Sequence, residues 1–319
     1  MSYASAGTLF GNFPEGTVYH DINSVGDGSL VSIDDSANFS AVNAQGDATT
    51  VMFGGHATAQ ATDEGLKAFA SMIVSNPVLI GSNNPYVVDF QSQTINPEGV
   101  PTMFWTEGFA EITDTISLGT AGVAYIKLKL DLSGTVDGVE QGNHARDNTQ
   151  SGGAYVAQRE VGEDGRVGSW ASLYQDGFST GFGEPRGISA EIWTNPISVL
   201  GQQATYHLEL TAHTSIDLSL WDPNTFGSSG TGDFWGIEGG VYNVTSDFSH
   251  TLKILEVQGF DINGNSINLG SATSSQGTVY NIAAVQDPTS TVPEPESLAL
   301  VLTGLGIMGI FSRRRRRSS

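Results

Sequence analysis

Apolar and polar side chains alternate strictly in several segments of the chain, and this two-residue period constrains the fold more than any other feature. In residues 125–132 every second side chain is aliphatic, namely Ile126, Leu128, Leu130 and Leu132. At about 180° per residue these side chains share one face of an extended chain, and the polar side chains between them share the other. The segment therefore predicts a β-strand that buries one face.

The same alternation recurs at spacings typical of antiparallel sheets. Residues 112–132 contain two alternating runs around a glycine-bearing turn and predict a hairpin. Residues 206–220 alternate as well, and Asn263-Gly264 is a strong tight-turn signal between two strand-like runs. The chain lacks both regular βα alternation and a fixed-period repeat. We therefore predict an all-β fold, an antiparallel two-sheet sandwich of jelly-roll-like type.

Two segments depart from this pattern. Residues 61–77 place Asp63 and Glu64 ahead of spaced apolar residues and end at a proline, which predicts a helix. Residues 137–187 are rich in Gly, Asp and Asn and predict a loop-rich excursion, either long loops or hairpins between sandwich strands. The sandwich body as a whole is expected to span residues 7–288.

Charge is distributed unevenly between the body and the end of the chain. The formal net charge is −21, but residues 1–312 contain eight Lys or Arg against 34 Asp or Glu, a formal charge of −26. Such a field repels phosphate groups, so we expect no nucleic-acid partner. The chain has no cysteine, which excludes disulfides, thiolate metal sites and a cysteine nucleophile.

Residues 289–319 differ in composition from the body. Residues 298–311 are mostly apolar and would form a hydrophobic helix about 21 Å long. A permanent membrane span needs roughly 20 residues, or about 30 Å, so this helix is too short for one. Five arginines follow, Arg313, Arg314, Arg315, Arg316 and Arg317. The positive-inside rule keeps these arginines in the cytoplasm and places the body on the other side of the membrane.

A proline-containing motif precedes the apolar segment, at Val292, Pro293, Glu294 and Pro295. The order of VPEP, apolar segment and arginine cluster resembles the PEP-CTERM sorting signal of Gram-negative bacteria. The resemblance implies recognition by an exosortase-like membrane enzyme and an inner-membrane intermediate held by the C-terminal helix until the tail is removed. It further implies release or attachment at the cell surface or in an exopolysaccharide-associated extracellular matrix. The body resembles, more loosely, secreted β-sandwiches that carry this signal, which implies no known catalytic residue.

An exported chain is expected to begin with a signal peptide, but residues 1–16 contain neither a basic region nor an apolar core. Ala4-Ser5-Ala6 fits an A-x-A cleavage site. We therefore expect residues 1–6 to be the remnant of a signal peptide that starts upstream, with the mature chain beginning near Gly7.

Two groups of residues carry metal-binding side chains. His207 and Glu209 share the polar face of one strand, about 7 Å apart, and would bind a metal only if another strand contributed ligands. A solvated sheet face explains them equally. Asp261, Asn263 and Asn265 alternate in DINGN and are candidate Ca²⁺ ligands, although a hairpin turn also accounts for them. No cofactor other than Ca²⁺ is expected.

Acidic residues next to aromatic ones raise the question of catalysis. Glu107 and Glu111 follow Trp105, and a glycosidase needs two carboxylates in a cleft. Because the chain has 34 acidic residues, such clusters also arise by chance. No G-x-S-x-G, H-E-x-x-H or phosphate-loop motif is present. We predict no catalytic residue and no enzymatic activity.

Exposed tryptophans are the natural platform for a sugar ring. Trp170 and Trp235 lie in glycine-rich surroundings and are the candidates for this role, whereas Trp193 and Trp221 lie in strand-like contexts that favour the core. The sequence thus predicts an exported, non-catalytic matrix or surface protein sorted by an exosortase-type system and associated with exopolysaccharide or biofilm. A carbohydrate-binding module and a secreted glycan-active enzyme stay open as alternatives.

Overall fold

The structure of the chain is a computed structural model. It describes residues 2–11, 18–25, 28–42, 48–75, 103–141, 150–162, 166–179, 183–217 and 241–285. The chain divides into two compact units, Met1–Ala283 and Ala284–Ser319. Every described strand belongs to the first unit.

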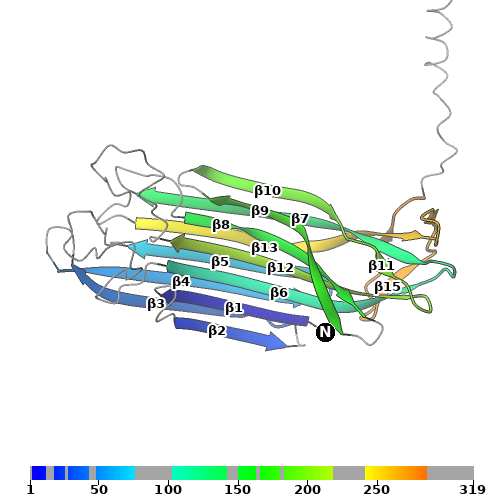
Figure 1. The fold of residues 1–319 in the computed structure, drawn as a ribbon, viewed down its shortest axis with the longest axis horizontal. Helices are drawn as coiled ribbons and strands as arrows, with labels where there is room; N and C mark the ends of the chain where they lie inside the picture. The colour runs from blue at the N-terminus through cyan, green and yellow to red at the C-terminus, as the bar shows by residue number, and fades with distance from the viewer. Residues whose placement is uncertain are drawn as a thin grey trace, which may run out of the picture. The chain divides into compact units, whose positions relative to one another are not determined.

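Two sheets make up the first unit, and their long strands are antiparallel (Figure 1). Sheet I has the order β2-β1-β6-β12-β8-β9, and β15 pairs with the end of β6. Its strands are β1 (Ser2–Gly11), β2 (Val18–Val25), β6 (Met103–Leu118), β8 (Gln150–Val161), β9 (Val167–Ser179), β12 (Gln203–Asp217) and β15 (Ala272–Ser274).

Sheet II has the order β10-β7-β13-β5-β4-β3. Its long strands are β3 (Val31–Val42), β4 (Ala48–Thr62), β5 (Gly65–Ser75), β7 (Tyr125–Gln141), β10 (Gly183–Trp193) and β13 (Val241–Phe260). The short strand β11 (Ile197–Ser198) pairs with β7, while β14 (Ser266–Ile267) and, in parallel, β16 (Asn281–Ile282) pair with β13.

The two sheets enclose one main core because each strand buries alternate residues. In β7 the buried side chains are Ile126, Leu128, Leu130 and Leu132, as the alternation predicts. In β12 they include Tyr206, Leu208, Leu210 and Ala212. Burial of each large aliphatic side chain stabilises the fold by about 1.5–3 kcal/mol. The all-β sandwich is therefore confirmed for the described residues, and the jelly-roll-like connection order stays a prediction.

Small residues fill the part of the core where β4 and β5 face β6. The buried residues of β4 and β5 there include Ala57, Ala59, Ala61, Ala68 and Ala70. A Cβ atom placed on Gly108 of β6 would lie 2.4 Å from the carbonyl oxygen of Thr58 and 2.6 Å from that of Phe69. The backbone of sheet I thus rests directly on the backbone of sheet II at this point.

The helix predicted over residues 61–77 is wrong. This segment contains the end of β4, a turn at Asp63 and Glu64, and all of β5, which pairs back on β4. Alternate residues of β5 are buried. Since Phe69 and Ile73 are apolar residues on the other face, both faces of β5 carry apolar side chains, and the two-residue period is hidden in the sequence.

The hairpin predicted over residues 112–132 is also wrong. Strand β6 belongs to sheet I and β7 to sheet II, so the turn between them crosses from one sheet to the other, with Gly122 at a φ of 83°. Both a hairpin and a connection between two sheets join two alternating strands through a turn that contains glycine. The sequence therefore does not distinguish the two kinds of connection. Of residues 137–187, the described part is mostly strand, because β8 and β9 form an antiparallel pair. The prediction of a loop-rich excursion is therefore wrong there, because β8 and β9 are strands of sheet I itself.

The ends of the predicted body differ in what the structure describes. The helix predicted at residues 298–311 and the sorting signal lie outside the described residues. Within the described part of the chain, no helix is long and apolar enough to cross a membrane. At the other end, β1 pairs with both β2 and β6 and buries Ala4 and Ala6. Cleavage near Gly7 stays a prediction, and it would remove about half of this strand.

Candidate functional site

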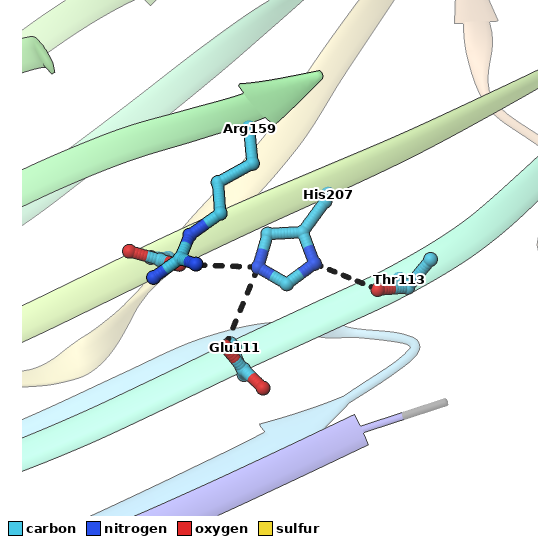
Figure 2. Close-up of polar contacts among 5 residues, drawn as sticks. Glu111, Thr113, Arg159 and His207 are labelled. Atoms are coloured by element: carbon cyan, nitrogen blue, oxygen red, sulfur yellow. Dashed lines mark hydrogen bonds and ion pairs between the residues drawn. The ribbon is translucent and has the colours of Figure 1, made fainter. Parts of the chain in front are cut away.

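Polar side chains from three neighbouring strands of sheet I meet on the face opposite the core. Glu209 of β12 lies opposite Glu111 of β6. His207 lies between Thr113 of β6 and Arg159 of β8 in the strand register. Because directly opposite residues of antiparallel strands point to the same face, these five side chains converge, and we call them the His207 cluster (Figure 2).

His207 is at the centre of the cluster. Its Nε2 lies 3.3 Å from Oε2 of Glu111 and 3.2 Å from Oε1 of Glu209, and its Nδ1 lies 2.8 Å from Oγ1 of Thr113. Arg159 forms an ion pair with the same carboxylate oxygen of Glu209. His207 and Glu209 are only 4% and 5% exposed. These two residues are thus nearly shielded from water although they lie on the outward face of the sheet, whereas the side chains of Glu111 and Arg159 stay partly accessible.

The charges in the cluster stabilise one another. Burial by itself lowers the pKa of His207, but hydrogen bonds to Glu111 and Glu209 and the charges of both carboxylates outweigh it, so the pKa is raised. Burial by itself raises the pKa of Glu209, but the hydrogen bond from His207 and the positive charge of Arg159 outweigh it, so the pKa is lowered. With His207 protonated, two carboxylates face two cations and the cluster is neutral.

Three of these residues also form a set of metal donors. The ligand atoms of Glu111, His207 and Glu209 all lie within 4.8 Å of one another. The sequence required a further ligand from a second strand, and Glu111 of β6 is placed where it could provide one. The alternative interpretation of His207 and Glu209 as a solvated sheet face is wrong, because both residues are buried.

A second group of side chains lies further along β6 and β12 on the same face. The rings of Trp105 and His213 stack with centroids 5.3 Å apart. Nε1 of Trp105 donates a hydrogen bond of 3.2 Å to Oε2 of Glu107. Burial raises the pKa of Glu107 and lowers the pKa of His213. Burial therefore favours the protonated, neutral carboxyl group of Glu107 and the deprotonated, neutral imidazole of His213.

The tryptophans predicted as a sugar platform are only partly described. Trp170 of β9 is 59% exposed, and its ring meets Tyr155 of β8 edge-on at 5.6 Å. Trp235, the second candidate, lies outside the described residues, as does Trp221. Trp193 of β10 is 42% exposed, so the prediction that it belongs to the core is wrong. Its strand context is as predicted, but it is on the outward side.

The three Ca²⁺ candidates form a turn in which the carboxylate oxygens of Asp261 accept hydrogen bonds from within the turn. Oδ1 of Asp261 accepts hydrogen bonds from the backbone N–H groups of Asn263 and Asn265, each 2.8 Å long, and Oδ2 accepts one from the side chain of Asn265. Gly264 adopts a φ of 84°, as a tight turn of this type requires. The hairpin interpretation thus accounts for the three residues, and a role in binding Ca²⁺ stays a prediction.

Sequence reasoning missed Arg159 and Thr113. Arg159 lies in the segment interpreted as a loop-rich excursion, and it is 48 positions from His207 in the chain. Only the pairing of β8 with β12 brings the two together. Alternation reveals which residues share a face of one strand, but it does not reveal which strands become neighbours.

Of three comparisons with known proteins, one identifies a part of the chain. A protein-family model described as the PEP-CTERM protein-sorting motif matches residues 291–317. A search of curated proteins gave no match. Among solved structures, one described as the structure of infectious bursal disease virus Gx strain is similar at 12% identity and a TM-score of 0.14, over 77% of this chain and 61% of that one. A TM-score this low supports no conclusion about fold or function.

Proposed function

We propose that this chain, which ends in a PEP-CTERM sorting motif, is an exported, non-catalytic protein of the cell surface or extracellular matrix. The observation that carries the proposal is the motif itself at residues 291–317, the C-terminal position of an exosortase substrate. The motif implies a membrane-associated intermediate and processing by an exosortase. Association with exopolysaccharide in a biofilm-like matrix is the finer part of the proposal.

The sandwich supports a non-catalytic role. Glu107 and Glu111 both lie on β6 four residues apart, about 13 Å along an extended strand, which is wider than the roughly 5 to 10 Å between the carboxylates of a glycosidase. Glu209 lies closer to Glu111, but it is buried and paired with both Arg159 and His207. These partners lower the pKa of Glu209, whereas the general acid of a glycosidase needs a raised pKa.

The export proposal is tested by expressing the full chain behind an added secretory signal peptide, because residues 1–16 contain none, in matched host strains with and without an exosortase. With the enzyme, we expect a shorter species outside the inner membrane. Without it, the full-length chain should stay in the membrane fraction. Pro293→Ala together with Pro295→Ala should reproduce the second result in the first strain, whereas Pro288→Ala, which lies just before the matched residues, should be processed normally. Identical size and location in both strains would overturn the proposal.

A carbohydrate-binding role is the second candidate, and the exposed ring of Trp170 favours it. An indole that is 59% exposed and supported by Tyr155 presents a flat apolar surface to a sugar ring. Binding of the full chain to a glycan array, compared with Trp170→Ala, tests this role. Trp193→Ala is the matched control, since Trp193 is also exposed but lies on sheet II. Equal binding by all three proteins would exclude Trp170 as the platform.

A further inference from the structure

We propose that Glu111, His207 and Glu209 form a binding site for one divalent transition-metal ion of the zinc class. The proposal is independent of export and of any glycan. It rests on the positions of three donor atoms, on the way Thr113 orients the imidazole, and on the pairing of two carboxylates across neighbouring strands.

The distances from Nε2 of His207 to the two carboxylate oxygens fit three atoms that bind the same metal ion. Zinc binds nitrogen and carboxylate oxygen at about 2.0–2.2 Å, so two ligands of a tetrahedral site are separated by roughly 3.3–3.5 Å. Nε2 lies 3.3 Å and 3.2 Å from the two carboxylate oxygens. Both distances exceed the roughly 2.7–2.9 Å of charge-assisted N–H···O bonds, as expected when one N–H is shared between two acceptors, and they equally suit three ligand atoms around one ion.

Thr113 sets the imidazole in the orientation that a metal needs. Its Oγ1 lies 2.8 Å from Nδ1 of His207. When the Nδ1–H group donates to this hydroxyl, the lone pair of Nε2 faces the two carboxylates. Metal-binding histidines are oriented by such a hydrogen bond from the other ring nitrogen. Strand pairing fixes the arrangement, because Thr113 lies directly opposite His207.

When His207 is neutral, Arg159 balances only one of the two carboxylates in the cluster, and a metal ion on Nε2 would supply the missing positive charge. Glu111 and Glu209 lie directly opposite each other on β6 and β12, and like charges in this position destabilise a sheet. Arg159 pairs with Glu209. Glu111 is the most exposed of the three donors, with 28% of its side chain accessible. Its side of the cluster is therefore where a metal would enter and where water would complete the coordination.

The donor set also indicates which metals the site prefers. An imidazole with two carboxylates suits zinc and neighbouring transition metals, whereas Ca²⁺ takes about six to eight oxygen ligands. The site therefore differs in chemistry and in place from the Asp261 turn, which the sequence suggested for Ca²⁺.

The test uses the full chain freed of metal with a chelator and then titrated calorimetrically with ZnCl₂. We expect one ion per chain, a raised Tm, and no comparable response to CaCl₂. His207→Gln should weaken zinc binding by at least about tenfold. Glu111→Gln changes the most exposed donor, so it should fold normally and weaken binding as well. His56→Gln, at an exposed histidine paired with Asp34 on sheet II, should bind zinc as tightly as the native chain.

The variant Arg159→Gln distinguishes a metal site from a network of ion pairs that leaves no room for a metal. Removal of the guanidinium frees Oε1 of Glu209 and makes the cluster more negative, so zinc should bind at least as tightly as it does to the native chain, and we expect several-fold tighter binding. Circular dichroism confirms that each variant is folded. Zinc binding weaker than about 1 mM in both the native chain and Arg159→Gln would overturn the proposal. Equally tight binding by the native chain and folded Glu111→Gln and His207→Gln would overturn it too.

Discussion

At the scale of single residues, burial makes protonation of His213 costly. Burial lowers the pKa of His213 below its usual value of 6.5. As the pH falls below about 6.5, the unfolded chain takes up a proton that the folded chain does not accept. The contribution of His213 to stability is therefore complete above pH 6.5 and is lost as the pH falls toward the lower pKa of the folded state.

We expect His213→Gln to remove this loss. Relative to the native chain, the free energy of unfolding of the variant should rise by on the order of 1 kcal/mol as the pH is lowered from about 7 to about 5. Urea denaturation at each pH measures the change. Glu107→Gln is the matched control. Because burial raises the pKa of Glu107, ionisation of Glu107 costs stability near neutral pH, and the advantage of this variant should shrink as the pH falls. A pH-independent difference for His213→Gln would contradict the prediction.

At the scale of strands, alternation predicted which residues are buried but not which strands are neighbours. In residues 125–132 every second side chain is aliphatic, and this alone predicts which face of the strand is buried. The prediction does not depend on knowing the partner strands. The pairing of β12 with β6 and β8 joins residues far apart in the chain, so the His207 cluster could not be found from local patterns. Only two of its three metal donors, His207 and Glu209 on one strand, were visible as a pair in the sequence.

The spacing between the sheets depends on Gly108 of β6. A Cβ atom there would meet backbone atoms of β4 and β5, the nearest at 2.4 Å, and backbone moves aside only if the sheets separate. Gly108→Ala should therefore lower the free energy of unfolding by about 3 kcal/mol, as measured by chemical denaturation. Gly187→Ala on β10 is the control, since a Cβ atom at that position meets nothing within 4 Å. Similar stabilities of the two variants would show that the sheets do not approach as closely as described.

Strand β1 allows a test of where the folded chain must begin. It lies between β2 and β6, and Ala4 and Ala6 are buried in the core. Deletion of residues 1–6 would leave part of β6 unpaired on that side. We expect a loss of at least about 2 kcal/mol, equivalent to roughly 4–8 °C in Tm for a domain of this size, measured by thermal denaturation. Unchanged stability would favour the predicted mature start near Gly7.

At the scale of the whole molecule, the sorting motif and the body carry opposite charge. Cleavage anywhere between Pro295 and Arg313 would remove all five clustered arginines and leave a formal charge of −25 or −26, with eight Lys or Arg remaining. The motif identifies a route of export, while the sandwich it delivers is strongly acidic. The acidity therefore belongs to the working protein rather than to its sorting signal.

Such an imbalance predicts how the processed protein responds to salt. Eight cations are too few to pair with more than 30 carboxylates, so mutual repulsion of the unpaired carboxylates should outweigh the ion pairs, and salt screens both. We expect the Tm to rise when NaCl is increased from about 10 mM to about 500 mM. Choline chloride should act in the same way, because the effect is screening and not binding of a particular cation. A Tm that falls with both salts would mean that ion pairs such as Arg159–Glu209 and Lys129–Glu191 outweigh the net charge of the chain.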